Sequence, residues 1–142
     1  MSGLVGGIGA RSGLLKPDAE SFHTTSLSDS WLNWDLTNNV TSDDGLRVQR
    51  YGKIYVVNLS CYKTGMSTGV FSSTIRTLTN SDITLPKSSV YMGCLTSYVG
   101  TAEDDKVGLC YLGSGGDLQI YGNNGAGTTF HLIGNFIGVD QG

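Results

Sequence analysis

The sequence predicts an all-β protein, folded as an antiparallel β-sandwich of the jelly-roll type. Short runs alternate apolar with polar residues, which is typical of strands that bury one face. Turn signals rich in Gly and Asn separate these runs at roughly the 8–12-residue spacing of such folds. No stretch shows a convincing helical period, and the 21 glycines among 142 residues also disfavour long helices.

The clearest pair of strands lies at residues 46–62, where two extended runs meet at a short turn, 51–53. Gly52 supplies the permissive backbone that a tight hairpin turn needs. The second run places one set of side chains on a single face: Tyr55, Val57, Leu59 and Cys61. Because that face carries no strongly polar side chain, we expect it to face the core.

The remaining strands are shorter or less regular. We expect them at 31–40, 69–78, 90–98, 107–112, 118–121 and 128–139. In the last of these, Phe130, Leu132 and Phe136 share one face. The Asn-Asn-Gly run at 123–125 predicts a turn.

The chain divides into two parts, an arm or linker at 1–29 and a β-sandwich head at 30–142. The first 15 residues are rich in glycine yet carry several aliphatic side chains. They fit either a flexible tail or an arm that packs on neighbouring subunits, and they lack the basic start of a secretory signal. Residues 16–29 are polar, contain the breaker Pro17, and are expected to be irregular.

Composition disfavours two classes of function. The net charge is −3 and no basic run occurs, which disfavours nucleic-acid binding, since that draws on clustered Lys and Arg. No stretch approaches the roughly 20 apolar residues of a membrane helix, so we expect no membrane insertion. Charged residues make up 15%, below the usual ~25%, which predicts an uncharged polar surface.

The cysteines Cys61, Cys94 and Cys110 are too widely spaced for a zinc motif. Each lies among apolar strand residues, so we expect three buried free thiols, consistent with assembly in a reducing cytoplasm. No cofactor or metal is expected.

No catalytic signature is present, and we expect the protein not to be an enzyme. The chain lacks a G-x-S-x-G elbow, and its two histidines are His23 and His131. A glycosidase needs two convergent carboxylates, whereas most of the candidates stand consecutively at 103–105. That acidic run lacks the residue order of a calcium loop, which favours a solvated turn over a metal or ligand contact.

Four motifs occur in a fixed order along residues 30–122. They are the Trp-Leu segment WLNWDLTNNV at 31–40, the hairpin RYGKIYVV at 50–57, the Thr-Leu-Pro step at 84–86 and GDLQI at 116–120. In this order the chain resembles the C-terminal head domains of bacteriophage tail fibres and baseplate receptor-binding proteins.

The resemblance implies a β-sandwich head, usually a homotrimer, that binds a host cell-surface polysaccharide. It also implies a place at the tail tip of the virion beside other tail or baseplate proteins, with assembly in the host cytoplasm. The alternative is a structural trimerising fibre tip or virion decoration module without a ligand of its own.

If the protein binds a glycan, residues 98–105 are the favoured site. An aromatic ring can stack on the C–H face of a sugar, and a carboxylate can accept hydrogen bonds from paired hydroxyls. This stretch offers both kinds of group: Tyr98, Glu103, Asp104 and Asp105. Trp34 is a further candidate, with core packing as its other interpretation.

Overall fold

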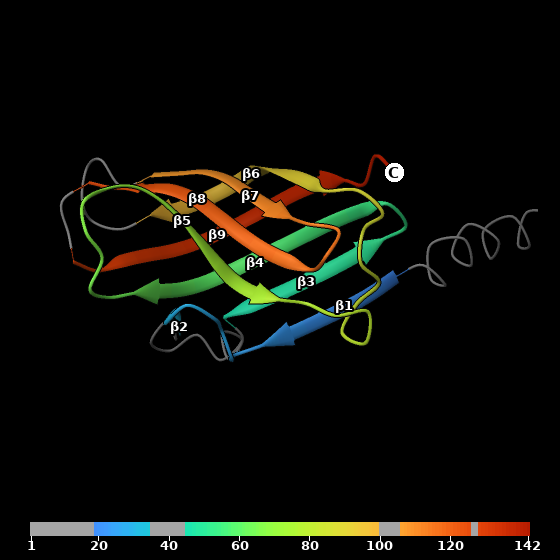
Figure 1. Cartoon of the computed structure of the whole chain (residues 1–142), viewed down its shortest axis with the longest axis horizontal. Coiled ribbons are helices and arrows are strands. Elements are labelled where there is room, and N and C mark those ends of the chain that lie inside the picture. Colours follow the sequence, from blue (N-terminus) through green and yellow to red (C-terminus); the bar gives the residue numbers. More distant parts are fainter. Residues whose placement is uncertain (1–18, 35–44, 100–105, 126–127) are drawn as a thin grey trace, which may run out of the picture.

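The computed structural model describes residues 19–34, 45–99, 106–125 and 128–142, which form an all-β antiparallel protein without a helix in these ranges (Figure 1). The strands are β1 (Ala19–Thr24), β2 (Leu32–Asn33), β3 (Leu46–Tyr51), β4 (Ile54–Lys63), β5 (Gly69–Thr77), β6 (Val90–Val99), β7 (Lys106–Leu112), β8 (Asp117–Asn124) and β9 (Phe130–Val139). They make one strongly curled sheet in the order β1-β3-β4-β9-β6-β7-β8-β5, with β2 beside β4. The prediction of an all-β antiparallel fold is confirmed.

The predicted hairpin is β3–β4. Tyr51 pairs with Ile54 across a two-residue turn, and Gly52 takes a φ of 62°, the left-handed region that favours glycine. The predicted core face of β4 is buried, with exposures of 0–2% at Tyr55, Val57, Leu59 and Cys61. On β9 the side chains of Phe130, Leu132 and Phe136 are fully buried, as predicted.

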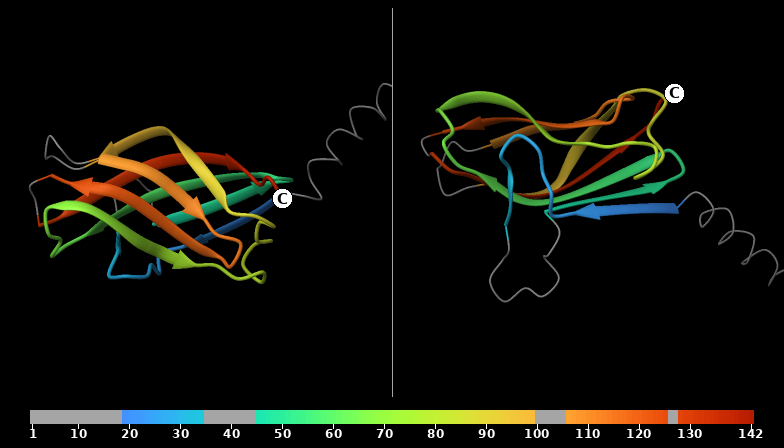
Figure 2. Two further views of the ribbon diagram at one scale, coloured as in Figure 1. Left: turned by 45° about the horizontal axis from the view of Figure 1, so that its top comes forward. Right: turned by 60° about the horizontal axis from the view of Figure 1, so that its bottom comes forward.

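Strand β6 joins the two halves of the sheet. Its first residues, Val90–Met92, pair with β7, whereas Gly93 and the residues after it pair with β9. The register with β9 shifts between Cys94 and Thr96, and such a bulge bends a strand. The part formed by β7, β8 and β5 therefore lies across from β1, β3 and β4 (Figure 2).

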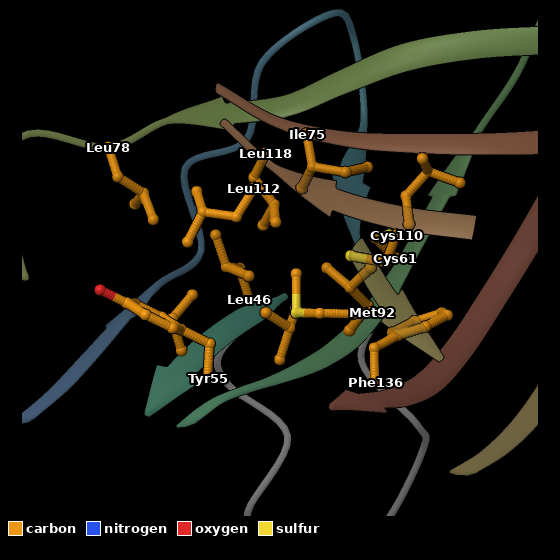
Figure 3. Close-up of a cluster of buried hydrophobic side chains, with 14 of the residues drawn as sticks. Leu46, Tyr55, Cys61, Ile75, Leu78, Met92, Cys110, Leu112, Leu118 and Phe136 are labelled. Atoms are coloured by element: carbon orange, nitrogen blue, oxygen red, sulfur yellow. The ribbon is translucent and has the colours of Figure 1, made fainter. Parts of the chain in front are cut away.

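The core fills the space between these two parts (Figure 3). One part contributes Leu46, Tyr55 and Cys61, and the other contributes Ile75 and Leu118, each at most 1% exposed. Burial of a large apolar side chain stabilises a fold by about 1.5–3 kcal/mol. Because these side chains come from strands distant in sequence, their burial stabilises the packing of one part of the curled sheet against the other.

A segment between β1 and β2 ties the two edges of the sheet together. The Ser28 N–H donates to the Ile75 carbonyl (2.6 Å). Trp31 Nε1 donates to Ser73 Oγ (2.8 Å), and the Ser73 hydroxyl donates to the Asp29 carboxylate. The Trp31 ring is 2% exposed and meets Phe130 edge to face, so it packs in the core.

Three expectations need correction. Residues 19–24 are not irregular: they form β1, which pairs with β3. Only Leu32–Asn33 of the expected strand 31–40 forms β2, and residues 35–44 lie outside the described ranges. The turn expected at 123–125 is replaced by strand, because Asn123 and Asn124 pair with β5.

A buried carboxylate fixes the chain after β9. Asp140 is 7% exposed and accepts hydrogen bonds from the N–H groups of Lys87 (2.8 Å), Ser88 (3.0 Å) and Gly142 (3.0 Å), and from the Ser88 hydroxyl. Burial raises the pKa of Asp140, but these donors outweigh that effect and hold the pKa well below its usual range.

We expect Val57→Asp to abolish soluble folding, because Val57 is fully buried and the new carboxylate would have no partner. Val56→Asp is the matched control, since Val56 points to the outer face and is half-buried. Soluble yield and the thermal midpoint measure the difference. A folded Val57→Asp beside an unfolded Val56→Asp would contradict the assignment of faces.

The Asp140 contacts predict a stability that depends on pH. Because the folded-state pKa is lowered, their contribution is present above the ordinary aspartate pKa of about 4 and is lost as the pH falls. We expect Asp140→Asn to reduce the free energy of unfolding in urea at pH 7 by about 2 kcal/mol, and by less at pH 3, where the carboxylate is still ionised in the folded state and part of the contribution remains. An equal loss at both pH values would contradict this prediction.

Candidate functional site

The outer face of β6, β7, β8 and β5 carries a row of polar and aromatic side chains. Tyr91 on β6 pairs with Tyr111 on β7, which pairs with Gln119 on β8, which in turn pairs with Thr74 on β5. Tyr121 projects from β8 one pleat further along, since Ile120 between them is buried. We call Tyr91, Tyr111, Asp117, Gln119 and Tyr121 the tyrosine surface.

The tyrosine surface lines a shallow depression of about 410 Å³, whose rim includes Ser114 in the β7–β8 turn. Tyr91 is 65% exposed and Tyr121 is 40% exposed, so both rings are accessible to a ligand. The rings of Tyr91 and Tyr111 lie 5.0 Å apart at 54°, so they form a small aromatic platform beside the depression.

Hydrogen bonds hold this surface in place. Tyr121 donates its hydroxyl to Gln119 Oε1 (2.9 Å), and Gln119 Nε2 lies 3.4 Å from the hydroxyl oxygen of Thr74. The Tyr111 hydroxyl lies 2.8 Å from Ser89 Oγ. These contacts orient the side chains before any ligand arrives, which reduces the entropy lost on binding.

A glycine turn places Asp117 at the edge of the depression. Gly116 has a φ of 101°, and its backbone N–H donates to the Gly113 carbonyl (2.9 Å). A Cβ at Gly116 would lie 2.0 Å from the Leu78 carbonyl oxygen, so a side chain is excluded there. The Asp117 carboxylate that follows accepts a hydrogen bond from Thr77 Oγ1 (2.7 Å).

Of the residues that the sequence singled out, Trp34 is the best described. It lies on the outer face of the other half of the sheet, where its ring is 4.6 Å from that of His131, itself 5.7 Å from Tyr62. Its backbone carbonyl accepts from Ser60 Oγ (2.9 Å). One side of the Trp34 ring therefore packs against the protein, and the ring does not join the tyrosine surface.

The 98–105 site stays a prediction. Tyr98 pairs with Ile133 through the β6 backbone, but its side chain lies outside the described part of the structure. Glu103, Asp104 and Asp105 also fall outside the described ranges. The tyrosine surface was missed because its tyrosines lie on strands, although their alternation with buried residues such as Met92 and Leu112 could have indicated that they point outward.

The thiols follow expectation where they are described. Cys61 and Cys110 are free and fully buried, and burial raises the pKa of Cys61 far above its ordinary value, so its thiolate is suppressed. The side chain of Cys94 lies outside the description. Within the described ranges, no group of three His, Cys, Asp or Glu side chains is placed to hold a metal ion.

The described residues contain no helix long and apolar enough to span a membrane. In comparisons with known proteins, no family model, curated protein or solved structure matches the chain.

Proposed function

We propose that the protein is a receptor-binding head of a bacteriophage tail fibre or baseplate, and that its tyrosine surface binds a host cell-surface polysaccharide. The observation that carries the proposal is the exposure of Tyr91 and Tyr121 beside the oriented amide of Gln119 and the carboxylate of Asp117. Aromatic rings cover the C–H faces of sugars, while amide and carboxylate groups exchange hydrogen bonds with sugar hydroxyls.

This arrangement supports binding rather than cleavage. Among the described residues, Asp117 is the one carboxylate that lines the depression, whereas the usual hydrolysis of a glycosidic bond uses a pair. It also supports binding over the alternative of a structural fibre tip or virion decoration module. In such a module the rings would serve only to pack against a partner, yet Tyr121 is hydrogen-bonded within its own surface.

A second part of the proposal concerns assembly into a trimer of jelly-roll-type heads. Four large apolar side chains are exposed on the outer face of β3, β4 and β9: Tyr51 (39%), Ile54 (39%), Ile137 (37%) and Val139 (46%). Tyr51, Ile54 and Val139 are directly paired across these strands, so they form one patch. Contiguous exposed apolar side chains mark interaction surfaces, and we infer that a second copy of this chain covers them.

The proposed location is the tail tip of the virion, beside other tail or baseplate proteins. The free thiols of Cys61 and Cys110 support assembly in the reducing cytoplasm of the host.

Glycan binding is tested with purified protein on an array of bacterial surface polysaccharides. We expect wild-type protein to bind at least one of them, and Tyr91→Ala with Tyr121→Ala to weaken that binding at least about tenfold, since each exposed ring would contribute roughly 1 kcal/mol. Tyr91→Phe should retain binding because it keeps the ring. Leu32→Ala, an exposed apolar position in the other half of the sheet, is the control. Equal binding by the double variant would refute the site.

Assembly is tested by light scattering after size exclusion. A trimer of 15.0 kDa chains should give about 45 kDa, and Ile54→Lys should shift the protein towards monomer by placing a charge in the apolar patch. Val70→Lys is the matched control, because Val70 is 89% exposed on the opposite half. A monomeric wild-type protein at micromolar concentration would rule out the trimer.

A further inference from the structure

A second depression adjoins the tyrosine surface. It has a volume of about 540 Å³, and its lining residues belong to β5, β8 and the segment that precedes β2. Its lining is rich in hydroxyls and carboxylates: Ser28, Asp29, Ser72, Ser73, Thr74 and Asp117.

The two depressions share a wall. Asp117 and Gln119 project from the outer side of β8 and line both of them. Across this wall Gln119 pairs with Thr74, and Asp117 pairs with Thr77. The surface therefore continues from Tyr91 on β6 across β7 and β8 to β5. At about 4.8 Å between neighbouring strands, it spans roughly 14 Å, which exceeds a single sugar ring.

Among the described residues, the charged side chains that line the second depression are carboxylates, and the cation Lys63 pairs with one of them. Asp29 and Asp117 are its charged lining residues. The hydrogen bond from Ser73 lowers the pKa of Asp29; burial opposes this effect, and the ammonium of Lys63 at 3.0 Å adds to it. Asp29 is thus a carboxylate at neutral pH and cannot serve as the general acid of a glycosidase. Because Lys63 offsets the charge of Asp29, a bound acidic sugar would meet repulsion from Asp117, while neutral and amino-bearing sugars would not.

We infer that the two depressions form one extended site for a linear oligosaccharide of at least two sugar units, neutral or amino-bearing rather than acidic. The inference rests on the proposed glycan-binding function. The tyrosine surface holds one unit by stacking, and the hydroxyls and carboxylates beyond Gln119 hold the next by hydrogen bonds.

The probe is an array that carries neutral, amino-bearing and uronic-acid-bearing oligosaccharides, from monosaccharides to hexasaccharides. Wild-type protein should bind neutral or amino-bearing oligosaccharides, more tightly as they lengthen beyond one unit. Ser72→Trp should fill the second depression and lower the affinity for the longer oligosaccharides about tenfold, while leaving short ones unaffected. Val70→Trp places the same ring two residues away on the exposed face of β5, outside the depression, and should change nothing. Equal thermal midpoints of the two variants show that both are folded.

Each remaining outcome overturns a different claim. If Ser72→Trp binds long oligosaccharides as tightly as wild-type protein, while Tyr91→Ala with Tyr121→Ala abolishes binding, the extended site is wrong and the proposed function stands. A preference for acidic oligosaccharides, or equal affinity for monosaccharides and hexasaccharides, also overturns the inference. If no saccharide of any class binds, both the inference and the proposed function fail.

Discussion

A single sheet can bury an apolar face only by folding over itself, and the whole structure depends on this constraint. The fold meets it through β6, which pairs with β7 before Gly93 and with β9 from Gly93 onward. Met92, the last residue on the β7 side, is buried in the core that this bend encloses. The hydrogen bond from Trp31 to Ser73 then connects the segment that follows the edge strand β1 to the other edge strand, β5. Both the tyrosine surface and the apolar patch are outer faces produced by the same curl.

Much of the fold could be predicted because period-two alternation is a local signal. The β3–β4 hairpin and the buried face of β9 follow from residues that are adjacent in sequence. β1 was missed because Phe22 is its one large apolar side chain, and its place depends on pairing with β3. Asn124 shows the opposite error: a local turn signal yields to pairing with β5, and its side-chain amide donates to the Ser67 carbonyl (3.0 Å).

The candidate site was harder to predict, because it depends on the lateral order of strands. Tyr91 and Gln119 are far apart in sequence and become neighbours only when β6, β7 and β8 align in register. Composition instead drew attention to residues 98–105, where an aromatic and several carboxylates stand close in sequence. The direction of each tyrosine could be predicted from its strand, but its neighbours could not, since no local rule sets which strands lie side by side.

The position of β9 has a consequence for how the chain folds. It is the last strand in the sequence, yet in the sheet it lies between β4 and β6 and links the two halves. During synthesis on a ribosome, the edges of β4 and β6 that pair with β9 stay unpaired until residues 130–139 emerge. Unpaired strand edges are common starting points of aggregation. Completion of the sheet is therefore a late and slow step, because it joins segments remote in sequence. A polypeptide without β9 would leave β4 and β6 each with an unpaired backbone edge.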